Sequence, residues 1–167
     1  MKKMFLYLSL VVLFSKCSTV QEKNNNHVKD GFYEVDKRGV DSTQFGELNG
    51  NEILITYNSI YNEQEYTKVL IDTSDFVPLE LETIPVTQKD SSQKSQLSIT
   101  LSTTALGKLK TFTGQRLMKT VAIVLDGEAI TMHKIKDTIT GGTMVISWCG
   151  ENACQRLYGR IKDNVKK

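Results

Sequence analysis

The 167-residue sequence has few of the residues that build metal centres or stiffen loops, with two histidines, three cysteines and two prolines. The histidines and cysteines leave little material for a metal site. With 40% hydrophobic residues, the composition excludes a disordered, collagen-like or multi-span membrane protein. The 21 basic residues nearly balance the 19 acidic ones, so no strong basic field indicates nucleic-acid binding.

No apolar run near the N-terminus is long enough to span a membrane. Met4–Phe14 follows Lys2 and Lys3 and has eleven residues. As a helix it would rise ~16 Å, about half of the ~30 Å hydrocarbon core of a bilayer. A positive start, a short apolar run and a polar break are typical of a secretory signal peptide, which we assign to residues 1–16. The alternative is a buried N-terminal helix of the mature fold.

The segment Leu13-Phe14-Ser15-Lys16-Cys17 resembles a bacterial lipobox, in which the cysteine becomes the lipidated first residue. Lys16 stands where that pattern prefers a small residue. The resemblance implies a lipoprotein of the bacterial cell envelope, acylated (palmitate included) at Cys17 and facing the periplasm. An ordinary signal peptide, with Cys17 a free thiol or removed, is the alternative. Cleavage before Cys17 would change the formal charge from +2 to +2 − 3 = −1, because Lys2, Lys3 and Lys16 are lost.

The polar stretch after Cys17 contains three consecutive asparagines and no apolar periodicity. We interpret residues 17–30 as the lipidated cysteine and a flexible tether. Residues 31–167 are predicted to form a single α+β domain.

The first part of this domain, residues 31–90, is predicted to be rich in β-structure. Short β-prone runs bounded by Gly, Asn or Asp occupy residues 32–35, 53–57 and 69–71. Alternation of apolar and polar residues predicts a further strand over 77–82, with Pro78 at its start or on an edge. Residues 89–95 are polar and predict a loop.

The second part, residues 96–167, has clearer signals. Strands are expected at 97–101, 121–125, 129–132 and 143–148, and helices over about 103–112 and 153–165. The run Val121–Leu125 is continuously apolar, as expected for a central strand covered on both faces. Asp126-Gly127 predicts a tight hairpin turn. This order of elements predicts an α+β sandwich with both helices on one face of a mainly antiparallel sheet.

Several segments of the second part resemble the head subdomain of the large periplasmic (P1) domain of SecD, the membrane component that assists Sec protein export. They are LSITL at 97–101 leading into the helix with Phe112-Thr113, KTVAIVLDGEAI at 119–130, ITGGTMVI at 139–146 and ENA at 151–153. The resemblance covers about residues 97–162. AIVLDG and ITGG in this order and spacing are its most specific elements.

The resemblance implies a ferredoxin-like two-layer α+β fold, no enzyme activity and no cofactor, because this region of SecD moves and contacts exported polypeptide. No transmembrane helix is expected after the signal peptide. Met132–Lys136 replaces the small and proline residues usual after the SecD hairpin, and Cys149 and Cys154 are not part of the SecD pattern.

Cys149 and Cys154 enclose four residues between a predicted strand end and a predicted helix start. In an oxidising compartment they are natural disulfide partners. Unbridged thiols, or redox activity with Cys154 as a helix-start thiolate, are the alternatives, although the spacing is not CxxC.

Other residues suggest turns rather than chemistry. Gly141-Gly142 lacks phosphate-loop spacing and precedes a strand, so a turn with positive φ is expected there. Asp126 and Glu128 are too few ligands for calcium. His133 has no second histidine nearby, and no GxSxG motif indicates a serine hydrolase. No metal, cofactor or catalytic residue is therefore assigned, and Asp126, Gly127, Gly141 and Gly142 remain candidate turn or interaction residues.

Two functions are compatible with these patterns. The first is a non-catalytic envelope lipoprotein that binds a protein or exported polypeptide, possibly of the translocase, by strand addition at a sheet edge or at the hairpin. The second is a membrane-anchored enzyme or inhibitor that uses the acidic residues of the first part, Asp72, Asp75, Glu80 and Glu82.

Overall fold

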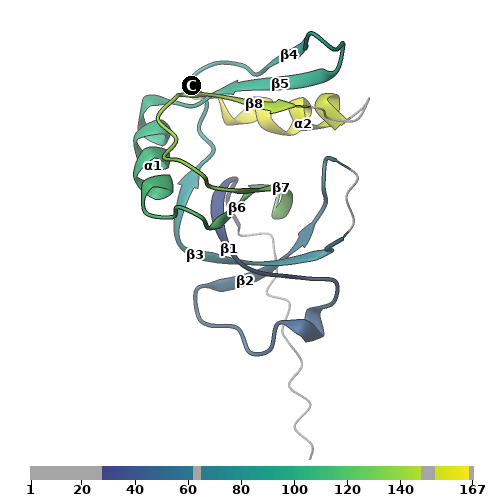
Figure 1. The fold of residues 1–167 in the computed structure, drawn as a ribbon, viewed down its shortest axis with the longest axis vertical. Helices are drawn as coiled ribbons and strands as arrows, with labels where there is room; N and C mark the ends of the chain where they lie inside the picture. Colours follow the sequence, from purple (N-terminus) through teal and green to yellow (C-terminus); the bar gives the residue numbers. More distant parts are fainter. Residues whose placement is uncertain (1–27, 62–64, 148–152, 166–167) are drawn as a thin grey trace, which may run out of the picture.

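The computed structural model describes residues 28–61, 65–147 and 153–165 (Figure 1). The strands are β1 (Gly31–Gly39), β2 (Glu52–Tyr57), β3 (Lys68–Pro78), β4 (Val86–Lys89), β5 (Ser95–Thr100), β6 (Thr120–Leu125), β7 (Glu128–Lys134) and β8 (Thr143–Ser147). The helices are α1 (Thr103–Gly114) and α2 (Ala153–Ile161), with short 3-10 turns η2 (Ser42–Gln44) and η3 (Lys162–Asn164). Within the described ranges, no helix combines the length and the hydrophobicity that a membrane span requires.

Five strands form a small closed barrel in the order β1-β3-β2-β7-β6, and β1 also pairs with β6 to close it. All neighbours are antiparallel except β2 and β7, which pair in parallel. The barrel interior is apolar and holds a stacked pair, Tyr33 and Phe76, whose ring centroids lie 5.0 Å apart. The Tyr33 hydroxyl donates to the Lys29 carbonyl at 2.8 Å, and burial raises the pKa of Tyr33 to about 12.

The remaining strands form a three-stranded antiparallel sheet in the order β4-β5-β8. In Figure 1, α2 lies between this sheet and the barrel, and α1 lies at one side and extends from the level of the sheet towards the barrel. The main core is the space between the layers. It collects buried side chains from the sheet, both helices and the outer face of the barrel.

Strand β6 is buried on both faces, which explains its unbroken apolar sequence. Val121, Ile123 and Leu125 contribute to the core beneath the helices, whereas Ala122 and Val124 contribute to the barrel interior. Because successive strand residues point to opposite faces, a strand between two cores has no place for a polar side chain. The prediction of a doubly covered strand is confirmed.

The expected α+β class is confirmed, but the strands are divided differently from the pattern-based prediction. The hairpin β6–β7 pairs with β1 and β2 of the first part instead of joining β5 and β8 in one sheet. The two parts of the sequence therefore share the barrel. Hydrophobic alternation shows which face of a strand is buried and carries no information on its neighbour, so local patterns could not predict this pairing.

One local prediction in the first part was wrong, and one strand was not predicted. The alternating segment 77–82 is not one strand, because β3 ends at Pro78 and Leu81 makes only isolated bridges with Leu101 and Val165. Pro78 has no N–H to donate, and the last backbone bond on this side runs from the Leu79 N–H to the Asp30 carbonyl at 3.0 Å. Strand β4, with four exposed residues, was not predicted because it has no apolar face.

Candidate functional site

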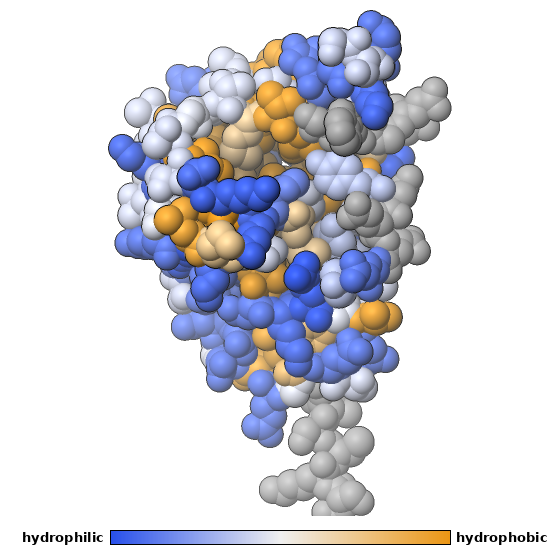
Figure 2. Space-filling model, viewed as in Figure 1, coloured by the Kyte–Doolittle hydropathy of each residue, from blue (hydrophilic) through white to orange (hydrophobic). Residues whose placement is uncertain are grey.

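The largest cavity described here is an apolar groove of about 450 Å³ between α1, the barrel and β8. It is lined by Phe32, Leu109, Thr113, Val121, Ile123, His133, Lys134, Ile135, Lys136, Asp137, Ile139, Met144 and Val145. We call this set the apolar groove. In Figure 2, apolar atoms are visible in the hollow between the upper layer and the barrel, with hydrophilic side chains beside them.

The inner wall of the apolar groove is rigid because it belongs to the main core. Leu109 is 1% exposed and sits on α1, whose first turn is fixed by the Ser102 hydroxyl accepting a hydrogen bond from the Ala105 N–H at 3.1 Å. Thr113, also buried, accepts at Oγ1 from the Ile139 N–H at 3.0 Å and so ties the segment before β8 to the helix.

The outer rim carries the polar groups of the groove. Lys134, Lys136 and Asp137 are exposed, and Ile135 between the lysines is buried. The His133 ring keeps exposed surface, but the surrounding chain removes enough water to lower its pKa below the usual value. At neutral pH the two lysines therefore supply the positive charge of the rim.

One side of the apolar groove is an edge strand. Among the described residues, β8 pairs with β5 and with no other strand. Val145 on β8 is 49% exposed although it is hydrophobic, and it lines the groove together with Met144. An edge strand next to an apolar groove is the arrangement by which a sheet accepts an additional extended chain.

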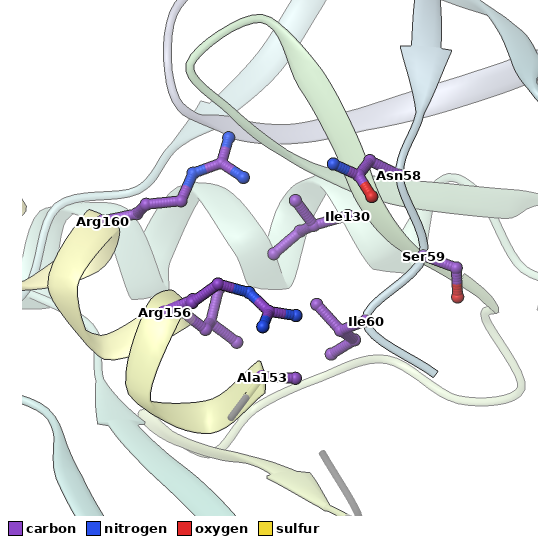
Figure 3. A pocket seen from close by; sticks show the side chains of 8 residues that line it. Asn58, Ser59, Ile60, Ile130, Ala153, Arg156 and Arg160 are labelled. Carbon is purple, nitrogen blue, oxygen red and sulfur yellow. The ribbon is translucent and has the colours of Figure 1, made fainter. Parts of the chain in front are cut away.

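A second, much smaller cavity of about 50 Å³ lies between α2 and the barrel (Figure 3). Arg156 and Arg160 approach it from α2, while Asn58, Ser59 and Ile60 lie opposite on the chain that follows β2. Arg160 is neutralised by acidic residues of the β6–β7 hairpin. The volume corresponds to one or two water molecules and is too small for a side chain of a partner.

A third cavity of about 330 Å³ adjoins the other free edge of the three-stranded sheet, β4. Its lining is mainly polar, with Thr87, Gln88, Lys89, Ser95 and Gln155 around Cys154. Its lining residues other than Cys154 are polar, so it offers a partner less apolar burial than the apolar groove does.

The four acidic residues of the enzyme hypothesis do not converge. Glu80 approaches the Ser102 hydroxyl, 3.4 Å away at the start of α1, whereas Asp72 accepts from the Ser74 N–H and hydroxyl, both at 2.8 Å. Asp75 forms an ion pair with Arg116 at 3.1 Å. None of the four lines a cavity described here.

Asp72 instead belongs to a group of carboxylates on the barrel with Glu34, Asp36 and Glu52. Partial burial of Asp36 and the negative charges of Glu34, Asp72 and Glu52 raise the pKa of Asp36 above its usual value. Within the described part of the chain, no group of three or more His, Cys, Asp or Glu residues is arranged to hold a metal ion.

The hairpin residues Asp126 and Gly127 are confirmed as a turn, since both have positive φ, 50° and 77°. The positive φ expected at Gly141-Gly142 was wrong, because neither glycine is in the left-handed region. Gly142 instead packs close to α1, where an added Cβ would lie 3.4 Å from Leu106. None of these four residues lines the apolar groove.

The cysteine assignments stay predictions. Cys17 and Cys149 lie outside the described residues, as do the signal peptide and most of the tether. Cys154 is buried in the first turn of α2, with 4% of its surface exposed.

The family model of the SecDF P1 head subdomain matches residues 58–154, which is more than half of the sequence. The chain belongs to the SecDF P1 head subdomain family. The match begins well before residues 97–162, whose motifs resemble SecD, and it includes β3, β4 and all four acidic residues of the enzyme hypothesis. These residues are therefore part of the SecDF-like region.

Structures of SecDF are among the solved structures that resemble this chain. A SecDF in a super-membrane-facing form has 24% identity and a TM-score of 0.46, covering 78% of this chain and 19% of its own. A structure described as the membrane component SecDF that enhances protein export has 24% identity and a TM-score of 0.47, covering 81% and 62%. SecDF from Thermus thermophilus, described as translocon-associated, has 14% identity and a TM-score of 0.42, covering 82% and 29%. The chain thus spans less than two thirds of each of these proteins, and no curated protein matches it.

Sequence reasoning did not identify the residues of the apolar groove. The signal was present in the alternation Lys134-Ile135-Lys136 and in the departure of Met132–Lys136 from the SecD pattern. Ile139 and Val145 gave no local sign, because a groove between a helix and two sheets exists only after all three are packed.

Proposed function

We propose that this protein is a non-catalytic envelope lipoprotein with a role in protein translocation, which binds exported polypeptide in an extended conformation. The bound segment adds a strand to the edge of β8 and places every second side chain in the apolar groove. The observation that carries this proposal is the position of the groove beside β8, which among the described residues is the edge strand of its sheet. Membership of the SecDF P1 head family agrees with it, as does the contact with exported polypeptide that the resemblance to SecD implies.

In this proposal, burial of apolar side chains in the groove supplies most of the binding free energy, and pairing with the edge of β8 holds the peptide in an extended conformation. Burying one Leu, Val or Phe side chain in such a groove contributes about 1.5–3 kcal/mol. The strand edge supplies backbone hydrogen bonds that any sequence can make, so the mode suits a partner with variable sequence. The cavity beside the β4 edge is lined mainly by polar side chains, so we assign binding to β8.

Photo-crosslinking in intact cells tests the site. A photoreactive amino acid at Val145 is expected to capture exported polypeptides during secretion. The matched control is Val40, which is 59% exposed and does not line the apolar groove. Equal capture at both positions, or none at Val145, would contradict the proposal.

Strand addition can be separated from simple apolar contact with synthetic peptides. In an antiparallel or parallel pair, only every second amide of a strand donates to a given neighbour. N-methylation of one set of alternate peptide amides is therefore expected to abolish binding, and N-methylation of the other set to leave it nearly unchanged. Equal effects of the two sets would argue against a strand at β8.

The membrane anchor is tested at Cys17. If this residue is acylated, several acyl chains at about 0.8 kcal/mol per buried methylene hold the protein stably on a membrane. Cys17→Ser is expected to release the protein from the membrane fraction into the soluble periplasmic fraction. Retention of the variant in the membrane fraction, as an uncleaved or cleaved protein, would remove the lipid anchor from the proposal.

A further inference from the structure

The rim of the apolar groove carries two lysines, Lys134 and Lys136, that have no acidic partner within the described part of the protein. Lys134 and Lys136 make no ion pair within the described residues. Asp137 is the one acidic residue among those that line the groove. By contrast, Arg116 and Arg160 are each held by two carboxylates elsewhere on the protein.

Lys134 and Lys136 are exposed on the rim, on either side of a buried residue. Ile135 is 6% exposed and anchors the segment in the main core, while the lysines on either side of it are exposed. The backbone of Ile135 is fixed as well, because its N–H donates to the Lys119 carbonyl at 2.9 Å and its carbonyl accepts from the Met118 N–H at 2.8 Å. Both ammonium groups are therefore tethered at the groove opening and are available to a ligand.

We propose that the apolar groove prefers extended segments in which an acidic residue flanks the apolar ones, with the peptide carboxylate pairing with Lys134 or Lys136. This inference rests on the proposed function and adds a charge preference to it. Segments with basic flanks meet two like charges at the rim and bind less well. The lysines thus act as specificity-determining residues, whereas the apolar wall supplies most of the affinity.

The occupant is a polypeptide and not an acyl chain with a carboxylate head, although both combine an apolar body with an acid. The groove lies against β8, which pairs with no strand other than β5 among the described residues. An extended peptide can form backbone hydrogen bonds to such an edge strand, whereas an acyl chain cannot, and it would bury backbone polar groups at a cost.

The test compares three synthetic ten-residue peptides with the same alternating apolar centre and with Glu, Gln or Lys flanks, binding to the full-length protein. We expect the Glu peptide to bind about two- to tenfold more tightly than the Gln peptide, as for one or two exposed ion pairs, and the Lys peptide to bind more weakly. The preference should shrink at high salt because the charges are exposed.

The double variant Lys134→Glu/Lys136→Glu should reverse the order of the Glu and Lys peptides and leave the affinity for the Gln peptide within about twofold. The control variant Lys108→Glu/Lys162→Glu has the same change in net charge at exposed positions that do not line the groove, and it should keep the original order. Thermal unfolding of both variants checks that they are folded.

Equal binding of the three peptides would overturn the charge preference and leave the proposed function standing. The preference is also wrong if the control variant reverses the order, because the effect would then come from net charge. If none of the peptides binds, the proposed function itself fails. Displacement of the Glu peptide by decanoate, together with no binding of the Gln peptide, would assign the rim to an amphiphile instead of a polypeptide.

Discussion

Arg160 on α2 donates a hydrogen bond from Nε to Oδ2 of Asp126, at 2.7 Å, in the turn between β6 and β7. Its Nη2 also donates to the Leu125 carbonyl at 2.6 Å and lies 3.4 Å from Oε2 of Glu128. One side chain thus ties the helical layer to the hairpin that completes the barrel.

Removal of this connection is expected to destabilise the fold moderately. Arg160→Ala should lower the free energy of unfolding by about 1 kcal/mol, because partly exposed ion pairs contribute little and one hydrogen bond to a carbonyl adds a similar amount. Arg156→Ala, one turn earlier on the same helix, is the matched control and should change stability by less than about 0.5 kcal/mol. Chemical denaturation of both variants measures the difference. Equal losses would show that the helix, and not the ion pair, carries the effect.

A glycine inside α1 offers a stabilising substitution. Gly107 is exposed, and a Cβ built there meets no atom within 4 Å. Gly107→Ala should raise the free energy of unfolding by about 0.5–1 kcal/mol, because alanine loses less backbone entropy when the helix forms. Gly31→Ala is the opposite case, since its Cβ would lie 2.4 Å from the Val77 carbonyl oxygen, and the barrel must shift to accept it. A lower melting temperature for Gly107→Ala would contradict this expectation.

The carboxylates around Asp36 are expected to lower the stability of the folded protein in a pH-dependent way. Burial and the charges of Glu34, Asp72 and Glu52 raise the pKa of Asp36 in the folded protein above the unfolded value of 3.8. As the pH rises through the window between these two pKa values, the unfolded state loses its proton first, so this group lowers stability as the pH increases. The penalty is fully present above the folded pKa and absent well below 3.8.

Asp36→Asn should therefore stabilise the protein at pH 7. The gain should be at most about 0.5 kcal/mol, because the group is largely exposed. The difference from the wild type should vanish when unfolding is measured at pH 3. A variant that is less stable at pH 7, or equally stabilised at both pH values, would show that Asp36 has a favourable contact that outweighs the repulsion.

Mutation of the buried wall of the apolar groove, at Leu109, should mainly affect stability, whereas mutation of its exposed side, at Val145, should mainly affect peptide binding. Val145→Asp is expected to lower peptide affinity by at least about tenfold with little change in melting temperature, because Val145 is half exposed and its loss removes one buried contact of the partner. Leu109→Ala should cost about 2–5 kcal/mol of stability, since Leu109 is buried in the core behind the groove. Calorimetric unfolding and peptide titration of both variants separate the two effects. Binding of the Val145→Asp variant at wild-type affinity would move the site away from β8.

The two C-terminal cysteines are expected to form a disulfide in the secreted protein. Titration of unfolded, unreduced protein should then detect no thiol at Cys149 or Cys154. Because the enclosed loop is short, the bridge should contribute only about 2 kcal/mol, and reduction should lower the melting temperature without unfolding the protein. Two reactive thiols in addition to Cys17 would show that the pair is unbridged.

Local sequence patterns were sufficient for the elements whose burial is determined by neighbours along the chain. Helix α1 has its apolar residues at helical spacing, and β6 has an unbroken apolar run between two turns. The Asp126-Gly127 pair predicts its turn because few residue pairs accept positive φ twice in succession. The SecD-like family could be identified from the same segments, since they carry its specific residues in order.

The pairing of the strands and the apolar groove were decided by tertiary structure alone. Nothing in the sequence of β6 and β7 indicates that they close a barrel with β1 and β2, because alternation shows which face is buried and not against which strand. Leu109, Ile139 and Val145 come from separate segments, and each has an ordinary local sequence. They line one groove because the helical layer holds the three-stranded sheet at a distance from the barrel, and that distance is a property of the packed side chains of all three layers.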